Sequence, residues 1–335
     1  MKKPVPLSYG ADASGLICAY AFGAQGRRSL DSNSLMTWLQ APPAHEFIWI
    51  HLNLSHASSE QWLHQHLELS ETFFEALHEG VRSTRIERAD DALIAVMNDV
   101  LFDFDFDASD IATLWMSITP HLVVTARSKP LRSIDRLRVA VKEGEVFGST
   151  TALLVHLLRD QADVLTQIVR SIADKTDHIE DRLLANRLEH HRANLGTMRR
   201  LLVRLQRLLA PEPSALFRLL NRPPLWIVDD DRQDLRQSTE EFATVIQDMT
   251  ALQERIKLLQ EEIAAQVGEQ NNRSLFVLTT VSVLALPINI IAGLLGMNVG
   301  GIPLADSHHG FWLIVLLVAS FTVIAVYWIF GRQAD

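Results

Sequence analysis

Cysteine is nearly absent from this sequence of 335 residues, because Cys18 is the only one. A single thiol excludes a disulfide within the chain and a zinc cage built from several thiolates. The sequence also lacks a phosphate-cradling glycine loop, a nucleophile elbow and a zinc-enzyme motif. It therefore predicts no obvious enzyme, no ATP site and no bound cofactor.

Charge is missing from the C-terminal part of the chain, where Asp306 is the only ionised side chain between Arg273 and Arg332. Two apolar runs, residues 274–295 and 311–330, fill most of this stretch. Each run is long enough to cross a hydrocarbon layer of ~30 Å as a helix. We therefore expect two membrane spans.

The loop between the two runs, residues 296–310, contains no Lys or Arg. Basic residues flank the pair instead: Arg255, Lys257, Arg273 and Arg332. The positive-inside rule then predicts that both termini face the cytoplasm and that the loop faces outward. Because no apolar core for a signal peptide follows Met1, we expect the large soluble part to stay in the cytoplasm.

The net charge of −9 comes from the soluble part of the chain. An acidic balance argues against nucleic acid as a partner and is compatible with attracting cations. Ordinary solubility explains the charge equally well.

The first apolar run differs from the second because it carries polar and small residues at helical spacing. Steps of three and four place most of them on one stripe: Asn272, Thr279, Ser282, Leu286, Asn289, Gly293 and Gly296. Such a stripe favours close helix packing, or it lines a water-filled path. Two helices cannot enclose a pore, so the second interpretation requires a symmetric ring of subunits.

A proline inside the first run, Pro287, is followed by Gly296-Met297-Asn298 at the outer end of that run. This arrangement before a short loop resembles the CorA superfamily of metal-ion transporters. The resemblance covers essentially the whole chain. It implies an α+β cytoplasmic domain whose long α-helices continue into two C-terminal transmembrane helices, within a funnel-shaped homopentamer.

Three further segments resemble the ZntB zinc-transporter branch of that superfamily. They are Gly300-Gly301-Ile302-Pro303 in the loop, Trp49–Asn53, and Gly80–Arg85. Some members of the branch have Gly-Val-Asn at the triplet, whereas this chain keeps Met297.

The expected organisation has an α/β domain over residues 1–148, a helical region with a stalk helix over 149–272, and a transmembrane domain over 273–335. Strands are expected at 16–21, 47–52, 92–106, 111–118 and 122–126. Long helix is expected over 150–220, with a break near Asn194-Leu195-Gly196. The next turn is marked by Pro211, Pro213 and the pair Pro223-Pro224.

A third long helix is expected from about Asp230, running without a stop into the first span. Its apolar residues step by three and four: Phe242, Val245, Met249, Leu252, Ile256, Leu259 and Ile263. This seam indicates coiled-coil-like packing, either within a subunit or around a ring.

The resemblance implies that Gly296, Met297 and Asn298 form the selective mouth of the pore. Asn298 is the first candidate for a metal contact, because asparagine oxygens suit a hydrated divalent ion. A helix C-cap is its structural alternative. Leu275 and Leu286 lie where the family has apolar constrictions, or they are plain core or lipid contacts.

Asn272, Thr279, Ser282 and Asn289, with Gly293, would line the pore between these constrictions; hydrogen bonding between helices is the alternative. In the outer loop, Asp306, His308 and His309 could concentrate cations, and the histidines could couple protons. A solvated loop explains them equally well. Asp306 is the second candidate metal contact.

Two charged series in the soluble part have plainer interpretations. Asp103, Asp105 and Asp107 would form one acidic face of a strand, either a solvated face or a site for a regulatory cation. The series Arg192, Arg199, Arg200, Arg204 and Arg207 is expected to form salt bridges along its helix; the alternative, that it lines the funnel, would be hostile to cations.

Together with these observations, the resemblance implies a homopentamer in the bacterial inner membrane that takes up Zn²⁺, with proton coupling and other divalent cations as further possibilities. A CorA-type Mg²⁺ or Co²⁺ channel is the alternative. Zinc efflux and a membrane-anchored sensor without transport are further alternatives.

Overall fold

A computed structural model describes residues 10–79, 84–185, 191–297 and 308–331. The chain divides into two compact units, residues 1–260 and 261–335. The helix α8 (Asp229–Leu295) belongs to both.

The first unit contains a mixed sheet of seven strands in the order β2-β1-β3-β7-β6-β5-β4. The strands are β1 (Leu16–Gly23), β2 (Gly26–Leu30), β3 (Phe47–Asn53), β4 (Arg85–Ala89), β5 (Ala92–Val100), β6 (Ile111–Ile118) and β7 (Leu122–Arg127). Only the central pair β3–β7 is parallel among the strands described. The predicted α/β part is confirmed, and the two strands that were not predicted, β2 and β4, are its edges.

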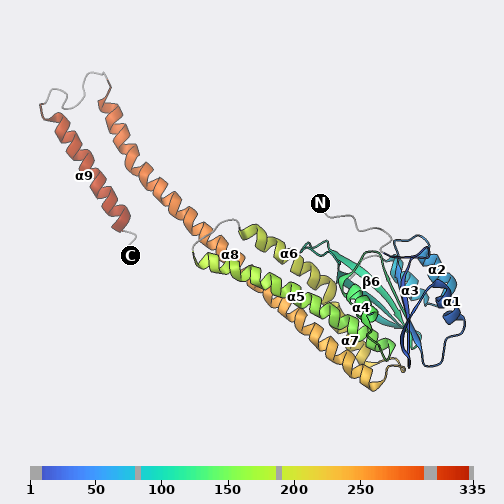
Figure 1. The fold of residues 1–335 in the computed structure, drawn as a ribbon. Helices are drawn as coiled ribbons and strands as arrows, with labels where there is room; N and C mark the ends of the chain where they lie inside the picture. Colours follow the sequence, from blue (N-terminus) through green and yellow to red (C-terminus); the bar gives the residue numbers. More distant parts are fainter. Residues whose placement is uncertain (1–9, 80–83, 186–190, 298–307, 332–335) are drawn as a thin grey trace. The chain divides into compact units, whose positions relative to one another are not determined.

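Helices cover both faces of this sheet (Figure 1). On one face, α1 (Ser32–Gln40), α2 (Ser59–His66) and α3 (Glu71–His78) pack on Ile48, Ile50 and Leu52 of β3. On the other, α4 (Arg132–Glu143), α5 (Thr150–Leu184) and α7 (Pro211–Asn221) pack around Trp49 and its neighbours. Alternate residues of β3 therefore serve two different cores.

The acidic strand face predicted at residues 103–107 is wrong, because β5 ends at Val100 and residues 103–109 form a loop. The side chains of Asp107 and Asp110 fold this loop by accepting backbone hydrogen bonds. Asp107 accepts from the Ser109 amide at 2.8 Å, and Asp110 accepts from the Asp105 amide at 3.2 Å. Local side-chain acceptors of this kind compete with a strand ladder.

The helix break predicted near Asn194–Gly196 is also wrong. α5 ends at Leu184, and α6 (His191–Leu209) already includes these three residues. Leu195 is fully buried, so its packing outweighs the cost of about 1 kcal/mol for Gly196 inside a helix. Pro211 lies at the first position of α7, where the missing N–H costs nothing.

α8 is one helix of 67 residues, which confirms that the stalk continues into the first apolar run. All seven residues of the predicted seam are buried. Polar contacts fix α8 beside its neighbours in the first unit: Arg255 pairs with Asp177 of α5 at 2.6 Å, and Gln206 of α6 donates to Thr250 at 2.8 Å. The part of the seam in the first unit, Phe242 to Leu259, therefore packs against helices of the same chain rather than around a ring of subunits.

Candidate ion pathway

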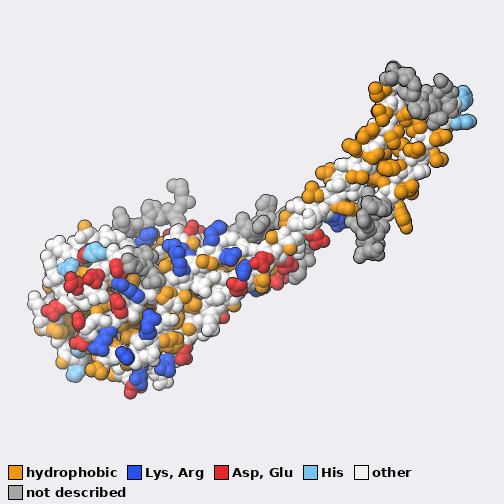
Figure 2. Space-filling view, turned by 180° about the vertical axis from the view of Figure 1, so that it is seen from behind, with side chains coloured by type: hydrophobic (Ala, Val, Ile, Leu, Met, Phe, Trp, Pro, Cys, Tyr) orange, Lys and Arg blue, Asp and Glu red, His pale blue; other side chains and the backbone are white. Residues whose placement is uncertain are grey.

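In the second unit, the end of α8 and α9 (Gly310–Gly331) are long and apolar enough to cross a membrane. Figure 2 shows hydrophobic side chains along the whole of this part, whereas charged side chains gather elsewhere. Each helix has one half-buried stripe. On α8 it comprises Thr280, Leu284, Ala285, Pro287, Ile288, Ile291 and Leu295; on α9 it comprises Ile314, Val318, Thr322, Ala325 and Val326.

The end of α8 and α9 belong to the same compact unit, and they are its two described apolar helices. We therefore infer that each helix covers the half-buried stripe of the other. All the described residues of the predicted pore stripe are exposed: Asn272, Leu275, Thr279, Ser282, Leu286, Asn289, Gly293 and Gly296. At 3.6 residues per turn, the centre of this set lies on the side of α8 opposite the half-buried stripe. The structure therefore brings the predicted residues together on one uncovered face.

Two features of this face bear on its chemistry. The apolar side chains of Leu275 and Leu286 are 59% and 62% exposed, so each projects from the helix. The hydroxyl of Ser282 donates to the carbonyl oxygen of Leu278 at 2.8 Å, so its oxygen keeps the capacity to accept hydrogen bonds.

The C-terminal end of α8 is closed by Gly296, whose amide donates to the carbonyl oxygen of Ala292 at 2.9 Å. A Cβ at this position would lie 3.1 Å from the same oxygen, so the close turn favours glycine. Met297 is 52% exposed. His308 and His309 are exposed in the turn just before α9.

Several predicted residues lie outside the described part of the chain, namely Asn298, Asp306, the Gly300–Pro303 segment and residues 80–83. Their roles stay predictions. Within the described ranges, no group of three or more His, Cys, Asp or Glu side chains is placed to hold a metal ion.

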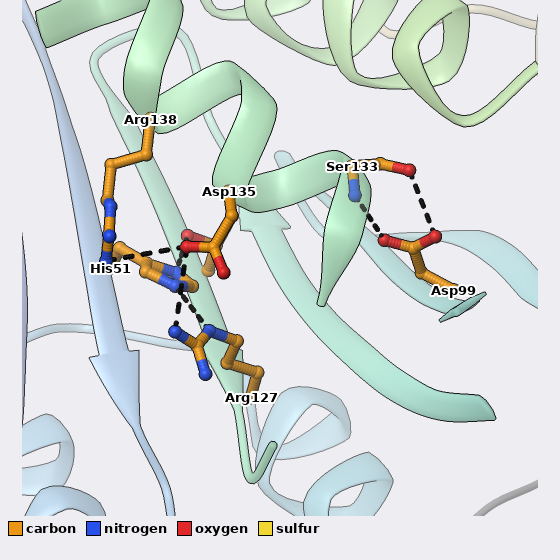
Figure 3. Close-up of polar contacts among 7 residues, drawn as sticks. His51, Asp99, Arg127, Ser133, Asp135 and Arg138 are labelled. Atoms are coloured by element: carbon orange, nitrogen blue, oxygen red, sulfur yellow. Dashed lines mark hydrogen bonds and ion pairs between the residues drawn. The ribbon is translucent and has the colours of Figure 1, made fainter. Parts of the chain in front are cut away.

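Sequence patterning missed a buried polar cluster between β3, β7 and α4 (Figure 3). Arg127 donates from Nε to Nε2 of His51 at 3.0 Å. A guanidinium has no acceptor, so Nε2 of His51 carries no proton and Nδ1 donates to the Thr125 hydroxyl at 2.8 Å. That hydroxyl also accepts from Trp49 Nε1 at 2.8 Å and donates to the carbonyl oxygen of Ile50.

Charge surrounds this neutral imidazole. The Asp135 carboxylate of α4 lies 3.8 Å from Arg127 and 3.5 Å from Arg138. Burial, followed by the nearby Arg127 charge, holds the pKa of His51 well below its usual value. Burial also raises the pKa of Cys18 to about 12, so its thiol is not a metal-binding thiolate near neutral pH.

Two further buried carboxyl groups join the helices to the sheet. Asp99 of β5 accepts from the amide and the hydroxyl of Ser133 at the start of α4, at 2.7 and 3.0 Å, and burial raises its pKa to about 6. Glu212 of α7 is fully buried, and burial raises its pKa to about 8. Polar residues within apolar runs, such as His51, were the available sequence signal for this interior.

The predicted salt bridges along the arginine series are wrong for the side chains that the structure describes. Arg199 donates to Gln260 at 3.2 Å and Arg200 donates to Thr197 at 3.0 Å, and neither they nor Arg204 and Arg207 form an ion pair within the described ranges. The reason is local, because α6 contains no acidic residue that could serve as a partner at helical spacing.

Comparison with known proteins identifies the family to which this chain belongs. The family described as "CorA-like Mg2+ transporter protein" matches residues 44–332. The divalent cation transporter CmaX of Pseudomonas aeruginosa is 29% identical over 329 residues, which are 96% of this chain and 97% of the relative. The zinc transport protein ZntB of Yersinia enterocolitica is 25% identical over 282 residues, 84% of this chain and 86% of the relative.

A solved structure of full-length CmaX matches with a TM-score of 0.81 and 26% identity, covering 97% of this chain and 99% of that one. The chain therefore belongs to the CorA family of divalent-cation transporters, which are membrane proteins with two C-terminal apolar helices. Its relatives named ZntB and CmaX agree with the resemblance to the ZntB branch.

Proposed function

We propose that this chain is one subunit of a homopentameric transporter that carries Zn²⁺ inward across the bacterial inner membrane, through a pore lined by α8. The termini lie in the cytoplasm and membrane lipid surrounds α9. Asn298 binds the hydrated ion at the outer mouth, beside Gly296 and Met297, and Asp306, His308 and His309 concentrate cations there.

The position of the polar stripe carries this proposal. Asn272, Thr279, Ser282 and Asn289 lie on the side of α8 opposite the half-buried stripe. Polar side chains directed into hydrocarbon are costly, so this side requires either water or other helices. A ring of identical subunits around a central path supplies both.

Zinc is proposed as the cargo because the Gly300–Pro303 segment resembles the ZntB branch and a ZntB protein is among the relatives. Inward movement of a divalent cation across ~100 mV releases roughly 4.6 kcal/mol, so uptake requires no nucleotide motor. Proton coupling would add a second driving force.

Flux into proteoliposomes containing the purified oligomer tests this function. We expect Zn²⁺ uptake that rises with an inward proton gradient, exceeds Mg²⁺ uptake, and falls in Asn298→Ala. Brisk Mg²⁺ flux with Zn²⁺ flux indifferent to pH would favour a CorA-type Mg²⁺ or Co²⁺ channel, in line with the description of the matching family. Absence of any flux would contradict transport and favour a membrane-anchored sensor.

A further inference from the structure

A cavity of about 600 Å³ lies in the first unit between α5 and α6. Its walls are Phe106, Lys175, His178, Ile179, Arg182, Asn194, Thr197, Met198 and Leu201. The volume is in the range of small-molecule sites, and the mixture of an apolar wall with a few polar groups is typical of them. Among the residues that the structure describes, no acidic side chain lines it.

Three nitrogen-bearing side chains of α5 meet at this cavity: Lys175, His178 and Arg182. Their spacing of three and four residues places them on one side of the helix. Asp177 and Glu180 of the same helix both pair with Arg255 of α8, and Asp174 and Asp181, next to Lys175 and Arg182 in the sequence, do not line the cavity. The charged side chains that line the described part of the cavity are therefore all basic.

Lys175 has an aromatic ring rather than a carboxylate as its neighbour. Its Nζ lies 3.7 Å from the centre of the Phe106 ring, a cation–π contact, and Lys175, His178 and Arg182 form no ion pair within the described part of the chain. Because charge-assisted bonds to an anion are stronger than such a contact, these groups are available to an anionic ligand.

The Phe106 wall is built at a conformational cost. Its φ of 57° is in the left-handed region, which is rare for a bulky residue. Asp107 and Asp110 hold the surrounding loop through the backbone hydrogen bonds described above, and the ring of Phe106 packs 5.4 Å from that of the buried Phe104. Strain of this kind persists where neighbouring structure enforces it, often beside a ligand.

We propose that this cavity binds a small organic anion, with an aromatic or apolar body against Phe106, Met198 and Leu201 and a phosphate or carboxylate against Lys175, His178 and Arg182. The site belongs to the first unit, whereas the proposed cation pathway runs along the part of α8 that belongs to the second unit. The anionic group belongs either to a soluble metabolite or to the headgroup of an anionic phospholipid.

Binding of 1-naphthyl phosphate to the full-length protein in nanodiscs of neutral lipid tests the site. Equilibrium dialysis should show saturable binding of one probe per chain, about tenfold or more tighter than inorganic phosphate or 1-naphthol. Lys175→Gln with Arg182→Gln should weaken the probe about tenfold or more. Phe106→Ala should weaken the probe while leaving inorganic phosphate unchanged.

Arg170→Gln is the matched control, because Arg170 is an exposed cation on the same helix that does not line the cavity. Equal losses in this control and in the double variant would overturn the proposal, as would the absence of saturable binding by the folded wild-type chain. An unchanged circular dichroism spectrum and melting temperature verify that each variant is folded. Loss of probe binding in nanodiscs containing phosphatidic acid assigns the site to a lipid headgroup, and retention assigns it to a soluble anion.

Discussion

At the scale of single residues, burial in the interior of the first unit disfavours the charged forms of two ionisable groups, His51 and Glu212. His51 keeps Nε2 unprotonated for the Arg127 donor, and Glu212 is fully buried on α7. Burial acts on the two in opposite directions, since it lowers the pKa of a histidine and raises that of a carboxyl group. The stability of the folded chain should therefore respond to both acid and alkali.

For Glu212, the folded chain retains the proton up to a pKa of about 8, whereas an unfolded glutamate releases it near pH ~4.3. Stability is lost as the pH rises through this window, by at most about 1.4 kcal/mol per pH unit. Glu212→Gln cannot ionise, so its unfolding free energy should increase relative to wild type between about pH 5 and pH 8. Chemical unfolding of the full chain in detergent measures this, and the exposed Glu240→Gln should show no such trend.

For His51, stability depends on pH in the opposite direction. An unfolded histidine takes up a proton below about pH 6.5, and the folded chain resists that uptake because the pKa of His51 is lowered. Wild-type stability should therefore fall as the pH drops below about 6.5, and His51→Gln should flatten this decline. The same unfolding measurement, with the exposed His121→Gln as control, checks it; an equal effect in both variants would contradict the assignment.

At the scale of elements, α8 combines a buried seam with an uncovered polar stripe. Leu259 is 5% exposed in the seam, and its neighbour Leu258 is 62% exposed. Leu259→Ala should lower the unfolding free energy by about 2–4 kcal/mol, because it leaves a cavity between packed helices. Leu258→Ala should change the unfolding free energy by less than about 0.5 kcal/mol. Thermal or chemical unfolding measures both variants, and equal losses of stability in the two would show that the seam is not the core of this helix layer.

Adjacent threonines test the two sides of the apolar part of α8. Thr279 is exposed on the proposed pore side, whereas Thr280 is half-buried on the opposite side. Thr279→Val replaces a hydroxyl with a methyl group of similar size and should reduce ion flux severalfold, because it removes a polar contact from the path. Thr280→Val should leave flux near wild type; the opposite ranking would place the path on the other face.

At the scale of the whole molecule, the uninterrupted α8 offers a mechanical connection between the soluble part and the apolar part. If changes in the soluble part regulate ion flux through α8, a flexible Gly-Ser insertion after Gly268 should abolish that regulation, because it interrupts the helical hydrogen bonds there. Flux assays in proteoliposomes that compare the insertion variant with wild type would show this. Unchanged regulation would count against transmission through the helix.

Elements whose own residues carry a strong strand or helix signal were predicted from the sequence, and elements without such a signal were missed. β3 and β6 were predicted because their apolar β-branched residues favour strands without reference to partners. β2 and β4 were missed, since their charged residues are those that protect sheet edges and carry no strand signal. The loop at Asp107 was mistaken for a strand because alternation does not reveal side chains that bond to their own backbone.

The sequence by itself determined the two apolar runs, the polar stripe and the heptad-like seam, because each is a local period along one helix. Only the tertiary structure decided which side of α8 is covered and that Phe242–Leu259 packs against α5 and α6 of the same chain. It alone joined His51 to Thr125 and Arg127, which lie more than seventy positions further along the chain. Such contacts depend on strand pairing and side-chain complementarity across the sheet, which no periodicity encodes.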